Sequence, residues 1–125
     1  MRLPLLLAAT LVASPALAQA PTPITVHLSS FSFAPDALAL THGQHYTLTL
    51  VNDAGGGHSF GAKEFFSAAT IEPKDLALIS KGAVEVPGGE SRTIHFTAPA
   101  IGIYKLKCTH TLHSAFGMKG QIVVR

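Results

Sequence analysis

Residues 101–120 of the chain read IGIYKLKCTHTLHSAFGMKG. Up to residue 108 the stretch alternates, with Tyr104, Leu106 and Cys108 on one face and Lys105 and Lys107 on the other. This period of two predicts a β-strand with one buried face, and its parity directs Cys108 inward. The residues after Cys108 no longer alternate, so we expect the strand to end there and a loop to follow.

Similar runs occur elsewhere in the chain. Residues 45–52 and 91–97 alternate in the same way, and Gly, Pro, Asn and Asp separate the runs. Further strands are expected at 24–33, 38–40 and 121–125. About six or seven short strands with regular turn signals predict an all-β fold, an antiparallel Greek-key β-sandwich. Residues 63–81 lack strict alternation and predict a short, partly helical insertion between two strands.

The first 18 residues have the pattern of a secretory signal peptide. Arg2 supplies the positive start, residues 3–12 form an apolar run, and Ala16-Leu17-Ala18 is a small-residue cleavage site. Because the apolar run is too short to cross a bilayer, we expect cleavage after Ala18 and a mature protein that is not inserted in a membrane. We expect it to be periplasmic or otherwise exported, with a flexible leader at 19–23 and one domain at 24–125.

Charge and cysteine content narrow the possible partners. Without Arg2 the chain has 8 basic and 7 acidic side chains, a formal charge of +1, which favours neither nucleic acid nor an anionic membrane surface as a partner. The single cysteine, Cys108, cannot form an internal disulfide, and an exposed thiol is a liability in an oxidising compartment. Cys108 is therefore either an inert buried thiol or a metal ligand.

Further donor side chains follow Cys108 at short spacing. Four residues separate Cys108 from His113, and four more separate His113 from Met118. One short loop can therefore bring a thiolate, an imidazole and a thioether to a common point. A fourth donor from elsewhere would complete the site, and His58, directly after the glycine triplet 55–57, is the best candidate. The sequence thus predicts a metal site made of these four residues.

This donor set suits copper. Cu(I) prefers soft sulfur and Cu(II) accepts imidazole well, so two histidines and one cysteine with a weakly bound methionine serve both oxidation states with little rearrangement. A structural zinc site more often uses four strong Cys or His ligands, whereas a methionine takes the fourth place here. We therefore expect one copper ion per chain, held in a type 1 blue copper site.

The loop resembles that of the cupredoxins, the blue copper protein family, and the likeness extends over residues 24–125. It rests on three motifs: Cys108-Thr109, His113-Ser114-Ala115 and Met118-Lys119-Gly120. The resemblance implies a cupredoxin-like sandwich, with His58 where the family carries its first ligand. It also implies that Asn52, just upstream, donates a hydrogen bond across to the cysteine loop.

The four-and-four spacing is also similar to the blue-copper loop of multicopper oxidases. In those enzymes, histidines on both sides of the cysteine reach a trinuclear copper cluster. Here the flanking residues are Lys107 and Thr109. We therefore expect a lone electron-carrying site and no enzyme activity.

The remaining histidines are weighed against this ligand set. His110 lies two residues from Cys108, and strand parity leaves it as a rival to His113, although we interpret it as a loop or surface residue. Four others are interpreted as surface residues without a metal role: His27, His42, His45 and His95. Phe60, Leu112 and Phe116 are expected to form part of an apolar wall that keeps water from the metal.

The resulting hypothesis is a monomeric one-electron carrier. Electrons would pass through the exposed edge of His113 to a redox partner protein that docks transiently at a nearby apolar patch. The alternative hypothesis is copper delivery or buffering by the same ligands without a dedicated electron-transfer role. A dedicated Cu(I) carrier more often has several methionines, whereas the chain beyond residue 18 has only Met118.

Overall fold

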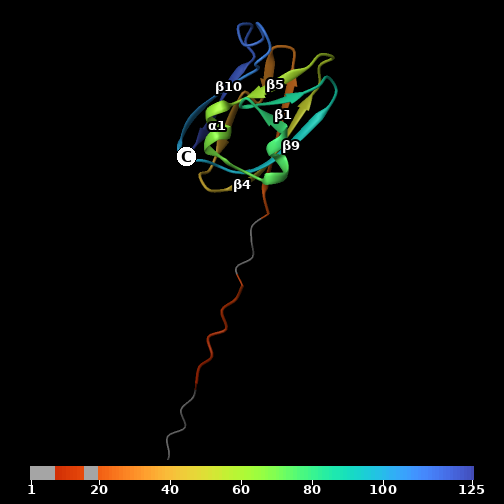
Figure 1. Cartoon of the computed structure of the whole chain (residues 1–125). Helices are drawn as coiled ribbons and strands as arrows, with labels where there is room; N and C mark the ends of the chain where they lie inside the picture. Colours follow the sequence, from red (N-terminus) through yellow and green to blue (C-terminus); the bar gives the residue numbers. More distant parts are fainter. Residues whose placement is uncertain (1–7, 16–19) are drawn as a thin grey trace, which may run out of the picture.

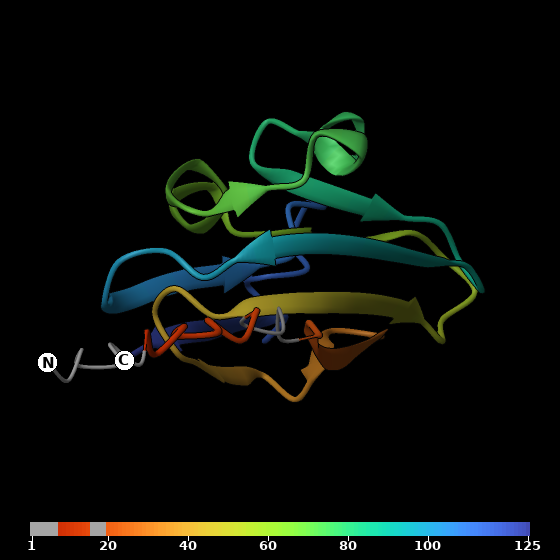
Figure 2. The same cartoon turned by 90° about the horizontal axis from the view of Figure 1, so that it is seen from below.

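Two β-sheets pack against each other in the computed structural model, which describes residues 8–15 and 20–125 (Figures 1 and 2). The first sheet has the order β2-β1-β4-β9-β6. Its strands are β1 (Thr22–Ser29), β2 (Ser32–Ala34), β4 (His45–Asn52), β6 (Thr70–Ile71) and β9 (Ser91–Thr97). The second sheet has the order β3-β11-β10-β5-β8-β7. Its strands are β3 (Ala37–Leu40), β5 (His58–Gly61), β7 (Ile79–Ser80), β8 (Ala83–Val86), β10 (Gly102–Lys107) and β11 (Lys119–Val124). The predicted β-sandwich is confirmed.

The antiparallel arrangement expected from the sequence holds for most strand pairs but not for two of them. β1 runs parallel to β4, and β3 runs parallel to β11. The chain passes from β1 and β2 in the first sheet to β3 in the second before it returns as β4. Because β1 and β4 are joined by this crossover and not by a hairpin, they are free to run in the same direction.

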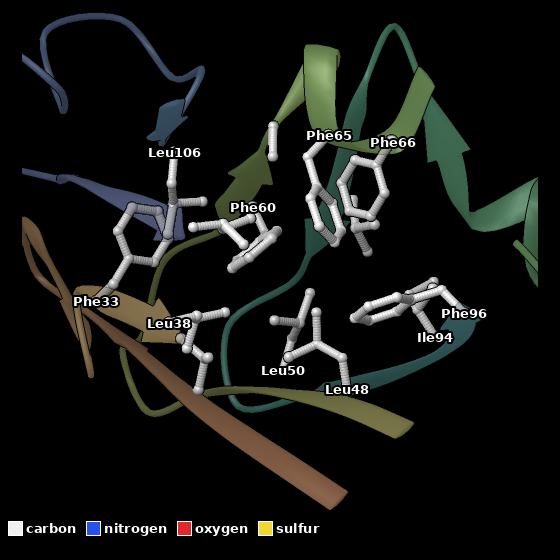
Figure 3. Close-up of a cluster of buried hydrophobic side chains, with 14 of the residues drawn as sticks. Phe33, Leu38, Leu48, Leu50, Phe60, Phe65, Phe66, Ile94, Phe96 and Leu106 are labelled. Atoms are coloured by element: carbon white, nitrogen blue, oxygen red, sulfur yellow. The ribbon is translucent and has the colours of Figure 1, made fainter. Parts of the chain in front are cut away.

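The core lies between the two sheets and follows the alternation of the strands. Leu48 and Leu50 of β4 and Ile94 of β9 are fully buried, as are Phe60 of β5 and Leu106 of β10. Figure 3 shows these side chains pointing toward one another from both sheets. Full burial of such a side chain stabilises the fold by about 1.5–3 kcal/mol relative to its exposure. This core fixes the two strands that carry His58 and Cys108.

The insertion at 63–81 is partly helical, as the sequence predicts. It contains the helix α1 (Lys63–Ala68), β6, the 3-10 helix η1 (Pro73–Leu78) and β7. Phe65 of α1 is buried with its ring 5.2 Å from that of Phe96 and 5.6 Å from that of Tyr104, in edge-to-face geometry. The insertion is therefore anchored to strands of both sheets through one aromatic side chain.

The start of the chain is described in part. Residues 8–15 are exposed and form neither helix nor strand, and the expected cleavage site at 16–18 lies outside the described residues. β1 already begins at Thr22, so Thr22 and Pro23, which the sequence places in the leader, pair with β4. Within the described part of the chain, no helix has the length and hydropathy needed to span a bilayer.

The two ends of the sandwich carry different features. The loop between β10 and β11 lies at one end, at the top of Figure 1 in blue, whereas β1 begins and η1 lies at the other end. β4 connects the two ends, from His45 near η1 to Asn52 near the loop before His58. A strand of eight residues spans about 23 Å at 3.3 Å per residue.

Candidate metal centre

His58, Cys108 and His113 converge at the end of the sandwich that carries the β10–β11 loop. His58 opens β5, Cys108 directly follows β10, and His113 lies in the loop. The Nδ1 atoms of the two histidines are 3.1 Å apart, and Cys108 Sγ lies 3.4 Å from His113 Nδ1 and 4.0 Å from His58 Nδ1. The structure thus brings together two imidazoles and a thiol that are up to 55 residues apart in sequence.

These separations fit a metal ion. Bonds of about 2.0 Å to nitrogen and 2.3 Å to sulfur in a trigonal plane place the two nitrogens about 3.5 Å apart and each nitrogen about 3.7 Å from the sulfur. The observed N–N distance of 3.1 Å and the shorter S–N distance of 3.4 Å lie below these values, and the longer S–N distance of 4.0 Å lies above. An ion can therefore occupy the centre of the triangle with small side-chain adjustments.

Backbone hydrogen bonds close the loop around this point. The Cys108 amide donates to the Met118 carbonyl at 3.0 Å, and the Met118 amide donates to the His113 carbonyl at 3.0 Å. The His113 amide donates in turn to the His110 carbonyl at 3.1 Å. Met118 is fully buried. The four-and-four spacing therefore corresponds to a loop that returns Met118 to the neighbourhood of Cys108.

Ser59, which sequence reasoning missed, places two hydrogen-bond donors near the cysteine sulfur. Its amide lies 3.4 Å and its hydroxyl 3.8 Å from Cys108 Sγ. The same hydroxyl accepts a hydrogen bond from the Thr109 amide at 2.8 Å and lies 2.7 Å from the Thr109 hydroxyl. These contacts hold Cys108 and Thr109 in place beside β5.

The environment of His58 favours its neutral form. Burial is the main cause that lowers its pKa below the ordinary value of 6.5, followed by the neighbouring His113 and His110, while Glu85 acts in the opposite direction. A neutral imidazole has a free nitrogen lone pair at neutral pH. His58 is therefore available as a ligand without first losing a proton.

Asn52 directs its side-chain hydrogen bonds to residues outside the cysteine loop, contrary to the expectation from the resemblance. Its side-chain amide donates to the carbonyls of Gly56 at 2.9 Å and Val86 at 2.8 Å, and its oxygen accepts from the Ala54 amide at 3.0 Å. Since Val86 pairs with His58 in the sheet, Asn52 fixes the strand start and the loop that lead to His58. It acts on the histidine side of the site and not on the sulfur.

His110 is close to the three donors but is held by another group. Its Nε2 lies 2.7 and 2.9 Å from the two carboxylate oxygens of Glu85. Its ring centroid lies 5.2 Å from that of His113 and 6.2 Å from that of His58. The three-donor cluster is made of His58, Cys108 and His113, so His110 borders it as a partner of Glu85.

The predicted apolar wall is only partly present. Phe60 is fully buried, but Leu112 and Phe116 are 62% and 66% exposed, because the loop directs them to the surface. Phe31, which sequence reasoning missed, packs its ring edge-on against His113 at 5.3 Å between centroids and lies 5.5 Å from Phe116. An exposed apolar patch made of Phe31, Leu112 and Phe116 thus borders His113.

Comparison with known sequences identifies the family of this fold. The family profile described as a cupredoxin-like domain matches residues 2–124. The chain belongs to the cupredoxin-like family. A search of curated proteins gave no match.

Solved cupredoxin-like structures share the architecture of the chain. Auracyanin B matches with a TM-score of 0.61 and 22% identity, over 87% of this chain and 93% of its own. A sodium dithionite-reduced auracyanin from Roseiflexus castenholzii matches with a TM-score of 0.62 and 24% identity, over 86% of this chain and 99% of its own. A multicopper oxidase from Campylobacter jejuni matches with a TM-score of 0.61 and 11% identity, over 90% of this chain but 32% of its own. The chain therefore corresponds to a whole auracyanin and to about a third of that oxidase.

Proposed function

We propose that this cupredoxin is an exported one-electron carrier with one type 1 copper ion, held by His58, Cys108 and His113 and more weakly by Met118. The observation that carries the proposal is the triangle of two imidazole nitrogens and one thiol at 3.1, 3.4 and 4.0 Å. Copper, when bound, supplies a one-electron couple at this point. The chain's own residues determine which ion binds and how an electron reaches it.

The donor set favours copper over zinc. The described residues near the triangle offer a buried thiol, two imidazoles and the fully buried thioether of Met118, and no fourth strong donor belongs to the cluster. Zinc sites generally complete four strong ligands, whereas copper accepts a weak thioether. The Ser59 amide lies 3.4 Å from Cys108 Sγ, where it can donate a hydrogen bond to a copper-bound sulfur.

Electron transfer is supported by the surface around His113. His113 is half-buried, the exposed Phe31 packs edge-on against its ring, and Phe116 packs against Phe31, with the exposed Leu112 next to His113 in the chain. A small apolar patch beside a buried redox centre allows brief docking and fast release, which a carrier requires. The similar auracyanin of R. castenholzii is a protein with a dithionite-reduced form, which supports a redox role for the fold.

The partner that we propose is a protein with an acidic docking surface. Lys107 and Lys119 are directly opposite each other in the β10–β11 ladder, and with Lys105 they line a surface hollow that also includes Ser114 and Ala115 of the loop. None of these lysines belongs to an ion pair among the described residues. Like charges placed opposite one another weaken a sheet, so a carboxylate-bearing partner would offset this cost.

Copper binding is tested by adding Cu(II) to the purified protein and recording the visible thiolate-to-copper charge-transfer band. We expect an intense band that Cys108→Ala and His58→Ala each abolish. The matched control is His110→Ala, which removes the neighbouring imidazole and leaves the band in place. A band that survives Cys108→Ala or disappears in His110→Ala would contradict the proposed ligands.

A second measurement separates electron transfer from copper delivery or buffering. The copper-loaded protein is mixed with a redox partner or a small oxidant, and in parallel with a Cu(I)-specific chelator. An electron carrier exchanges electrons rapidly and keeps its metal. Loss of the metal to the chelator on the time scale of electron exchange would support delivery instead.

A further inference from the structure

A second group of metal-ligating side chains lies at the opposite end of the sandwich, near η1. One potential ligand atom from each of Glu72, Asp75 and His95 lies within 4.8 Å of the others. The β6–β9 register explains why Glu72 is present. Thr70 pairs with Thr97 and Ile71 with Phe96, so Glu72 continues the ladder opposite His95, and its amide donates to the His95 carbonyl at 2.9 Å. Opposed residues of a ladder share a face.

Asp75 sets the orientation and the tautomer of His95. The Oδ2 atom of Asp75 accepts hydrogen bonds from the backbone amide and from the ring Nδ1 of His95, both at 2.8 Å. The Asp75 carboxylate is 9% exposed and the His95 side chain 26%. Because Nδ1 carries the proton of this bond, Nε2 keeps its lone pair free. A carboxylate behind a histidine in this way is the usual support of a metal-bound imidazole.

A second histidine faces the same hollow. His45 of β4 is opposite Thr97 and is therefore a diagonal neighbour of His95 on the outer face of the sheet. Its Nδ1 lies 2.8 Å from the Thr97 hydroxyl, and in the tautomer in which Nδ1 donates to that hydroxyl its Nε2 keeps a free lone pair. His45, Glu72 and His95 all line one hollow of about 220 Å³. A cavity of that size accommodates an ion with water ligands.

We infer that Glu72 and His95 form a second metal site, for a divalent first-row ion of the Cu²⁺ or Zn²⁺ type, with Asp75 as the positioning residue and His45, on the wall of the same hollow, as the further imidazole. Two imidazoles and one carboxylate are the donors that such ions prefer, whereas Mg²⁺ and Ca²⁺ require mainly oxygen. Glu72 also lies 3.3 Å from Lys74, but that pair is exposed on both sides. An exposed ion pair contributes little and gives way to a metal ion.

Titration of the purified protein with Zn²⁺, followed by residue-resolved NMR, tests the site. We expect the amide signals of residues 45, 72 and 95 to shift, and these shifts to saturate when one Zn²⁺ ion per chain has bound at this end of the sandwich. The signals of His58 and the loop after Cys108 report the first site separately. In Cys108→Ala the response near His95 persists, so a failure of the proposed copper site and a failure of this site are distinguishable.

Isosteric variants decide the ligands. Glu72→Gln, His45→Gln and His95→Gln should each weaken Zn²⁺ binding at this end by about tenfold or more, since even the loss of a supporting residue has that effect. Glu72 and His45 are exposed, so their variants are expected to remain folded. An unchanged affinity in either variant, or the absence of a saturable shift at residue 95, would overturn the site.

His27→Gln is the matched control. His27 makes the same kind of pair, with its Nδ1 2.6 Å from Asp53 Oδ2. Among the described residues that pair does not belong to any three-donor cluster. We expect His27→Gln to leave the Zn²⁺ affinity unchanged. A tenfold loss in this control would show that a His–Asp pair alone accounts for the binding and would refute the three-ligand site.

Discussion

Replacing Ser59 by alanine tests the hydrogen bonds that fix the cysteine. The hydroxyl group of this buried serine makes two close contacts with Thr109, at 2.8 Å to the amide and 2.7 Å to the hydroxyl. Each such bond contributes about 0.5–1.5 kcal/mol net, so Ser59→Ala should destabilise the protein by about 1–3 kcal/mol. In a domain of roughly 100 residues this corresponds to a melting temperature lower by about 4 °C or more.

The assay is thermal unfolding of the metal-free protein, because a bound metal would add its own stabilisation. A double-mutant cycle with Thr109→Val isolates the bond between the two hydroxyls, since valine keeps the backbone amide that donates to Ser59. We expect a coupling free energy of about 0.5 kcal/mol or more. In copper-loaded protein, Ser59→Ala also removes a donor directed at Cys108 Sγ and should lower the reduction potential.

Two results would refute this reasoning. A melting temperature of Ser59→Ala within about 1 °C of the wild type would show that the contacts with Thr109 contribute nothing. Strict additivity of Ser59→Ala and Thr109→Val would show that the two hydroxyls do not interact despite their separation of 2.7 Å.

Three further predictions follow from the same end of the molecule. Because burial lowers the pKa of His58, the unfolded chain binds a proton below about pH 6.5 that the folded site resists, and the metal-free protein should lose stability as the pH falls through this range. Urea unfolding at stepwise pH should show that the free energy of unfolding depends less on pH in His58→Gln than in the wild type. Gly61→Ala should lower the free energy of unfolding by about 1–3 kcal/mol, because a Cβ at Gly61 would lie 2.7 Å from the Lys107 carbonyl oxygen and 2.8 Å from Thr109 Cγ2. Gly55→Ala is the control: a Cβ there has nothing within 4 Å, so the melting temperature should not change. Lys107→Gln and Lys119→Gln should each reduce the salt dependence of electron transfer from an acidic redox protein in stopped-flow measurements, and an unchanged salt dependence would contradict the proposed partner.

Local alternation was sufficient to predict the strands at 45–52, 91–97 and 101–108 and the direction of Cys108, but β5 and β8 are too short to show it and were missed. The parity of residues 101–108 places Leu106 and Cys108 on one face, and both are buried. The prediction succeeded because a period of two depends only on neighbouring residues and on which face meets the core. The helical character of 63–81 was predictable for the same reason, since alternation is absent there.

Contacts set by strand register could not be predicted in this way. Ser59 reaches Cys108 because β5 lies beside β10, and Phe31 reaches His113 from the turn between β1 and β2. Similarly, His45 and Glu72 meet His95 only through the β4–β9 and β6–β9 pairings. The sequence alone places His45 and His95 at the surface without a metal role, because it does not state which strands are neighbours.

The way in which the donors are held bears on the choice between electron transfer and copper delivery. His58 lies in a fully buried strand and Cys108 directly follows another, so neither can move far without disrupting the core. His113 and Met118 lie on the loop, but backbone hydrogen bonds tie this loop to itself and to Cys108. A delivery protein must open its site to release the ion, whereas an electron carrier gains from ligands that stay in place when the charge of the ion changes. Donors that the core and the loop's own hydrogen bonds hold within 4.0 Å of one another favour the carrier.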